Sequence, residues 1–160
     1  MADLERIIQL RNVRYDKLLR KQSLAEEALE AARETLLRAR NEMDAFAEKM
    51  RTLEIELLTE LLNTRLHKTD FDIFSEKLKK AEEETADLVR RHDQAALNFQ
   101  KNERAMERVG REAQEVQSKI NKLNQLRSVI AEEERGAELR AVDAQSDDIA
   151  ATIFARLRKQ

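Results

Sequence analysis

Residues 71–130 read FDIFSEKLKKAEEETADLVRRHDQAALNFQKNERAMERVGREAQEVQSKINKLNQLRSVI, and apolar or small residues recur in them at alternating steps of three and four. We call this row of residues the second ladder, because a similar row precedes it in the sequence. Four polar or charged residues interrupt it: Thr85, His92, Asn102 and Arg127. A first ladder with the same spacing runs from Leu4 to Leu57 and is broken only at Arg11 and Gln22. An apolar stripe that recurs every 3.5 residues over such a length predicts a coiled coil.

The composition favours long, solvated helices over a compact globular core. Charged residues make up 39% of the 160 residues and aromatic residues only 4%, while two glycines and no proline leave little to interrupt a helix. The formal net charge is only -2, and no aromatic residues alternate with the basic ones. Because nucleic-acid binding needs a basic field or stacking rings, we expect no nucleic-acid partner.

The residue types that carry chemistry are scarce. The chain has no cysteine, its two histidines (His67 and His92) are far apart, and neither glycine belongs to a phosphate-binding loop. We therefore expect no catalytic residue, no metal, no cofactor and no enzymatic activity. No run of about 20 apolar residues is present, so we expect a soluble cytoplasmic protein.

The two ladders share one phase, so the sequence permits either a single long helix or a fold-back. All three ladder positions between them are polar, namely Glu60, Thr64 and His67. Thr69 and Asp70 offer N-capping oxygens for a new helix just before Phe71. These features favour a fold-back with a turn near residues 62–70.

The predicted fold is all-α, a long two-helix antiparallel coiled-coil hairpin over residues 1–135. Its helices span about residues 3–63 and about 70–135. The preferred pairing sets Leu18 opposite Ala113 and Ala32 opposite Phe99, so that small side chains face large ones. A shift of one heptad remains an alternative, and it sets Ala25 opposite Ala113.

Residues 136–160 form a C-terminal extension that is helical or partly disordered. Gly136 is a candidate helix stop, and the segment from Ser146 to Asp148 resembles the cap and acidic first turn of a new helix. Apolar residues then follow at helical spacing: Ile149, Ile153, Phe154 and Leu157. This extension is either a frayed tail or a helix that orders on a partner.

Three features stand out from the solvated coiled-coil background. The first is an apolar tip cluster next to the turn: Leu58, Leu61, Leu62, Leu66 and Phe71. It either packs on itself or forms an exposed contact patch. The second is a break in the core packing near Gln22, Asn102 and Gly110, which either specifies the register through buried polar groups or forms a hinge.

The third feature is a basic N-terminal arm that includes Arg14, Lys17 and Arg20. An acidic stretch, Glu132 to Glu134, follows the second ladder. We expect the two to form ion pairs across the hairpin, or to face a charged ring or pore.

The string from Phe74 to Thr85, FSEKLKKAEEET, resembles the segment just after the turn in the FliJ/YscO family of type III secretion proteins. Flagellar members carry Phe-x-x-x-Leu-x-x-Ala-x-x-x-His there, and this chain matches with Phe74, Leu78 and Ala81. Thr85 stands where flagellar members have His, so the resemblance favours the virulence-type branch. The C-terminal end and the length are also similar in style to the family.

The resemblance implies a non-enzymatic central stalk, with paired termini in the pore of a hexameric export ATPase. The turn end would meet the cytoplasmic domain of the export gate, through Phe74, Leu78, Ala81 and Thr85. Secretion chaperones are further implied partners, and the membrane is reached only indirectly through the gate. The basic arm and Glu132 to Glu134 are the candidate ATPase contacts. The alternative function is a prefoldin-like coiled-coil holdase chaperone or a structural tether.

Overall fold

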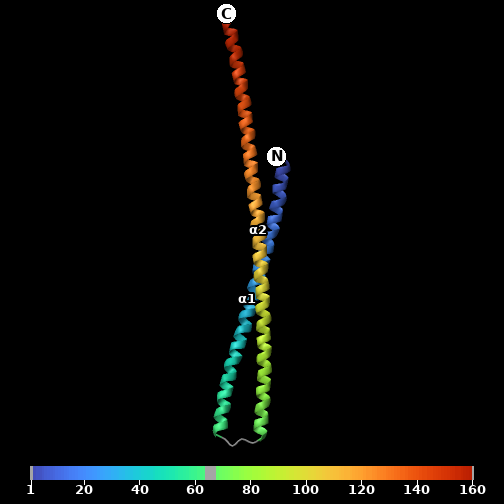
Figure 1. Ribbon diagram of the computed structural model, residues 1–160, viewed down its shortest axis with the longest axis vertical. Coiled ribbons are helices and arrows are strands. Elements are labelled where there is room, and N and C mark those ends of the chain that lie inside the picture. Colours follow the sequence, from blue (N-terminus) through green and yellow to red (C-terminus); the bar gives the residue numbers. More distant parts are fainter. Residues whose placement is uncertain (1, 64–67, 160) are drawn as a thin grey trace. The chain divides into compact units, whose positions relative to one another are not determined.

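The computed structural model describes residues 2–63 and 68–159, and it contains two long helices and no strand in those residues. Helix α1 spans Ala2–Asn63 and helix α2 spans Lys68–Arg158. The two helices pack against each other in opposite directions, which confirms the predicted two-helix antiparallel hairpin (Figure 1). The centre of the turn predicted near residues 62–70, residues 64–67, lies outside the described residues.

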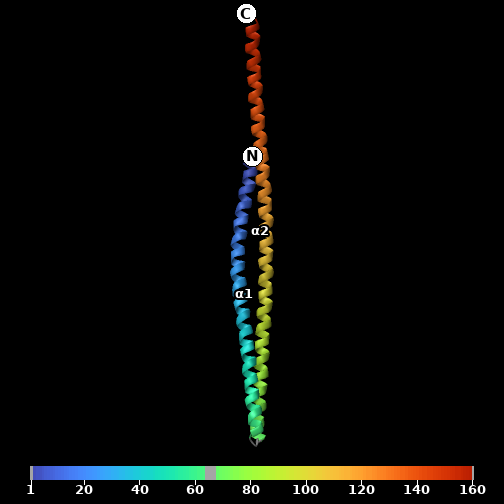
Figure 2. The same ribbon diagram turned by 90° about the vertical axis from the view of Figure 1, so that its left-hand side faces the viewer.

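The chain divides into two compact units, and each contains one segment of each helix. One unit comprises residues 20–111, in which the two segments diverge toward the turn (Figure 1). The other comprises residues 1–19 and 112–160. In this terminal unit α2 continues well beyond the start of α1, as both views show (Figure 2).

Burial follows the two ladders. The buried side chains of the described residues all occupy ladder positions: Ile8, Leu18, Ala32, Ala81, Ala95, Ala113, Val116 and Ile120. Almost all the other ladder residues are partly buried, whereas most of the positions between them are exposed. The heptad pattern therefore identified the buried line where the two helices meet, which we call the seam.

Leu18 shows how the seam is packed in the terminal unit. Its side chain is 6% exposed and forms a buried cluster with Ala113, Val116 and Ile120, against which Tyr15 also packs. Residues at steps of three and four on one helix outline the hole that receives a side chain from the other helix. The expected neighbour Ala113 is thus present, together with two further residues along α2.

The 20–111 unit shows the same antiparallel pairing. The Arg33 guanidinium lies 6.0 Å from the centroid of the Phe99 ring, which places the residue after Ala32 beside Phe99. Ala39 and Ala95 line one groove between the helices. Small side chains at these positions allow the helices to approach closely.

Three of the four polar or charged residues that interrupt the second ladder bond within their own helix. Thr85 donates a hydrogen bond to the Ala81 carbonyl oxygen at 2.8 Å, and Asn102 donates one to the Asn98 carbonyl oxygen at 2.8 Å. His92 Nδ1 lies 3.4 Å from a carboxylate oxygen of Asp93. No buried side-chain nitrogen or oxygen among the described residues lacks a partner. Local bonding explains why these residues are tolerated near the seam.

One expected helix boundary is wrong. Gly136 does not end α2, because the helix continues to Arg158 and the glycine has no positive φ. An isolated glycine costs only about 1 kcal/mol relative to alanine, and the flanking residues are strong helix formers. Ser146 to Asp148 therefore lie inside a continuous helix and cap nothing. The start of α2 at Lys68 lies within two residues of the expected start at about residue 70, and Thr69 and Asp70 lie in its first turn.

Candidate functional site

The tip cluster is largely exposed in the 20–111 unit. The exposed fractions of Leu58, Leu62 and Phe71 are 59%, 87% and 59%. Leu61 is partly buried, and Leu66 lies outside the described residues. Self-packing therefore does not cover these three apolar side chains.

Two more apolar side chains next to the turn were missed by the sequence analysis. Ile55 is 65% exposed and Ile73 is 52% exposed. Both lie off the ladders, and an isoleucine at a solvent-facing heptad position is the signal that identifies them. They widen the apolar surface around the turn end on both helices.

The residues matched to the family string occupy the seam or its edge. Ala81 is 9% exposed, and Phe74 and Leu78 are partly buried. Thr85 directs its hydroxyl to the Ala81 carbonyl oxygen. Ala81 therefore contributes to packing between α1 and α2, and it offers little surface to a partner.

The charged surfaces of the terminal unit are not paired as expected. Arg14 and Lys17 on α1 are exposed, and so are Glu132 to Glu134 on α2. No ion pair joins the basic arm to the acidic stretch in the described residues, so the expected bridging is wrong. The packing of Leu18 with Ala113, Val116 and Ile120 places Glu132 to Glu134 near the start of α1, roughly ten residues along the axis from Arg14 and Lys17, so the two groups are too far apart to form ion pairs. Arg20, in the other unit, is also exposed.

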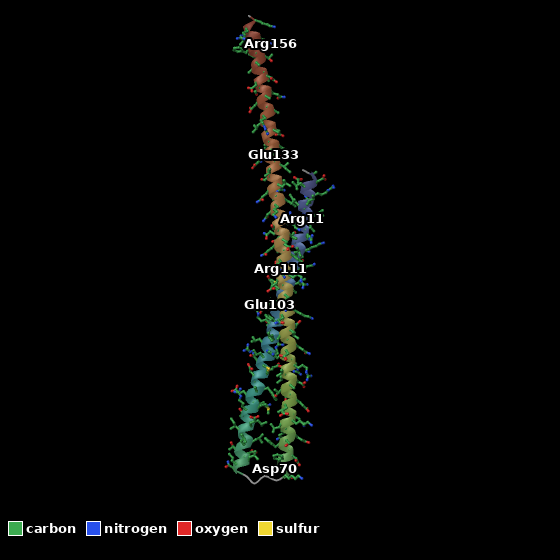
Figure 3. All side chains as sticks on the ribbon, viewed as in Figure 1. Arg11, Asp70, Glu103, Arg111, Glu133 and Arg156 are labelled. Atoms are coloured by element: carbon green, nitrogen blue, oxygen red, sulfur yellow. The ribbon has the colours of Figure 1, made fainter. Side chains whose placement is uncertain are left out.

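The part of α2 beyond α1 is exposed on all sides. Every described residue from 137 to 159 is exposed, including large apolar side chains. Figure 3 shows the side chains between Glu133 and Arg156 extending from α2 with no second helix beside them. The exposed apolar residues of this segment are Leu139, Val142, Ile149, Ile153, Phe154 and Leu157.

Enclosed sites are not a feature of the described residues. The grooves along the helices are open. The groove that contains Ala39 and Ala95 is also lined by Thr35, Arg38, Glu42, Arg91 and Asn98. No group of three His, Asp or Glu side chains in residues 2–63 and 68–159 is placed to hold a metal ion. Within the same residues, neither helix has an apolar stretch long enough to cross a membrane.

Comparisons with family models, with curated proteins and with solved structures found no match to this chain.

Proposed function

We propose that the protein is the non-enzymatic central stalk of a type III protein secretion apparatus of the virulence type. It would link a hexameric export ATPase to the cytoplasmic domain of the export gate and assist the handling of secretion chaperones. It would act in the cytoplasm, at the inner membrane, without entering the membrane. The proposal combines the two-helix hairpin with the resemblance of the string from Phe74 to Thr85 to the FliJ/YscO family.

The observation that carries the proposal is the unequal length of the two helices. Helix α1 has 62 residues and α2 has 91, so the hairpin ends in a charged single-helix extension. A narrow helical end without a globular domain fits the pore of a ring. Exposed charges of both signs on this end suit electrostatic contacts with ring subunits.

The mechanism follows from symmetry. A hairpin has no sixfold symmetry, so the six subunits of a ring around it meet different side chains. Subunits that face Arg14 and Lys17 on α1 experience a positive field, whereas subunits that face α2 at the same height do not meet these side chains. Such unequal contacts place the subunits in different conformational states, because a partner shifts each subunit toward the conformation that the partner binds more tightly. The protein supplies no catalytic group and changes only the fraction of ring subunits in each conformational state.

The turn end is the proposed gate contact. Leu58, Leu62 and Phe71 are exposed there, and a partner with an apolar surface can cover them. We place the contact on these side chains because Ala81, a matched gate-facing residue, is buried against the other helix.

Reversing the charges of the basic arm tests the ATPase contact. The variant Arg14→Glu, Lys17→Glu and Arg20→Glu is expected to lose most of the stimulation of ATP hydrolysis by the cognate export ATPase. The reason is that three favourable charge contacts become repulsive. Helicity is expected to be unchanged, because all three side chains are exposed. The measurements are ATP hydrolysis at fixed ATPase concentration and far-UV circular dichroism.

The matched control is Lys101→Glu, Arg104→Glu and Arg108→Glu, which changes net charge equally at exposed positions of the 20–111 unit. The control is expected to stimulate hydrolysis like the unmodified protein. Equal stimulation by the arm variant and the control would contradict the proposed placement of the arm.

A prefoldin-like holdase chaperone or structural tether is the second candidate. The exposed apolar surface at the turn end favours it, because such a surface can bind unfolded clients. A holdase is expected to suppress aggregation of an unfolded client without any ATPase present. Suppression of aggregation without stimulation of the ATPase would favour this candidate over the stalk.

A further inference from the structure

The extension of α2 carries an apolar stripe that differs from the seam. Its positions follow one another at steps of three and four from residue 139 onward: Leu139, Val142, Ser146, Ile149, Ile153 and Arg156. The second ladder, continued past Ile130, instead gives mainly alanines, from Ala137 to Ala155. The two rows lie on roughly opposite sides of one helix, since about 100° separates successive residues. The extension therefore has a large-residue face that the pairing with α1 does not use.

This face is uncovered in the structure. The exposed fractions are 65% for Leu139, 56% for Val142, 61% for Ile149 and 53% for Ile153. Phe154 lies next to the stripe, and the Arg158 guanidinium lies 5.5 Å from its ring centroid. The ring of Phe154 is thus partly covered by its own helix, whereas the two isoleucines and Val142 have no such cover. A row of large apolar residues at heptad spacing is the pattern that pairs with a second helix.

Charge along the extension points to the identity of that second helix. Acidic residues dominate its beginning and middle: Glu138, Asp143, Asp147 and Asp148. Basic residues end it: Arg156, Arg158 and Lys159. A second copy of the same segment, laid antiparallel, brings the acidic beginning of each copy toward the basic end of the other, while Asp147 and Asp148 in the middle lie on the outer side of the helix, away from the stripe. A parallel copy would align like charges along the whole contact, which is unfavourable.

We propose that the extensions of two copies of this chain pair as a short antiparallel coiled coil. In the register that overlaps the whole stripe, Val142 of each copy faces Ile153 of the other copy. At the centre of the contact, Ser146 of each copy faces Ile149 of the other. Glu138 of each copy then lies beside Lys159 of the other at a position flanking the stripe. This proposal does not rest on the proposed function, because it uses only the extension.

The contact is expected to be weak. Each copy contributes about 20 residues, or about 30 Å of helix, and a contact of that size lies at or below the standard interface. Self-association is therefore expected at about 10 μM to 100 μM rather than at nanomolar concentration. A dimer of this strength assembles and dissociates with protein concentration.

Sedimentation equilibrium of the full chain tests the proposal. From about 1 to 200 μM, the average mass is expected to rise from that of a monomer toward that of a dimer. Ile149→Glu with Ile153→Glu is expected to lower the association constant by about tenfold or more, since four buried isoleucines per dimer become charged. The control Leu24→Glu with Leu37→Glu changes two leucines that are 65% and 57% exposed on α1, and it is expected to associate like the unmodified chain.

Disulfide trapping tests the orientation, and the absence of native cysteine makes it unambiguous. In an equimolar mixture of Ser146→Cys and Ile149→Cys chains, the antiparallel register predicts mainly the mixed disulfide. A parallel pair predicts the two homodimers, Ser146→Cys with itself and Ile149→Cys with itself, instead. A monomer over the whole concentration range, equal association of the isoleucine variant and the control, or a parallel disulfide pattern overturns the proposal.

Discussion

Leu18→Ala is expected to lower the free energy of unfolding by about 2–4 kcal/mol, since the side chain fills a packed site in the seam. Leu18 is 6% exposed, and its cluster with Ala113, Val116 and Ile120 is the buried cluster of the terminal unit. The substitution leaves helix propensity nearly unchanged, because alanine and leucine are both strong helix formers. The loss therefore reports packing alone. Urea denaturation followed by far-UV circular dichroism measures it.

The matched control is Leu24→Ala, at a leucine that is 65% exposed on the same helix. Its expected effect lies within about 0.5 kcal/mol of zero. If the two variants are destabilised equally, burial at the seam does not distinguish these leucines and the antiparallel packing described here is contradicted.

Leu62→Glu combined with Phe71→Glu is expected to weaken binding to the cytoplasmic domain of the export gate by about 10- to 100-fold. The two side chains are 87% and 59% exposed, so each is available to a partner and neither is needed inside the hairpin. A carboxylate placed in an apolar contact must be desolvated without a partner, which accounts for the size of the effect. Isothermal titration calorimetry measures the affinity, and circular dichroism shows that helicity is retained.

Leu24→Glu with Leu37→Glu serves as the control, because it also adds two charges at exposed leucines but away from the turn. Its affinity for the gate domain is expected to match that of the unmodified protein. Unchanged binding by the Leu62 and Phe71 variant would show that the turn end does not contact the gate.

The helical fold was predictable because one physical rule governs most of it. In a two-helix coil only the residues at heptad spacing are covered, so the pattern in the sequence and the pattern of burial coincide. Ile8, Leu18 and Ile120 were identified as seam residues in this way, and all three are buried. The turn was predictable because a polar gap leaves the ladder without residues to bury.

The boundaries and the surfaces were less predictable. Gly136 has a local preference against helix, but its neighbours outweigh it, and the sequence offers no simple measure of that balance. Ion pairing of the basic arm also failed as an expectation, since the packing of Leu18 places the acidic stretch roughly ten residues along the axis from Arg14 and Lys17. The exposure of Leu58 and Leu62 depends on how far the helices diverge near the turn, which no heptad position specifies.

The measurement that tests the central claim most directly is ATP hydrolysis by the cognate export ATPase, titrated with this protein at concentrations where the ATPase is mostly not hexameric. Hexamer content is measured in the same samples by light scattering. A stalk that fills the ring is expected to raise both hydrolysis and the hexamer fraction together, with saturation near one protein per ring. If neither quantity changes while the added protein remains helical, the stalk function is contradicted.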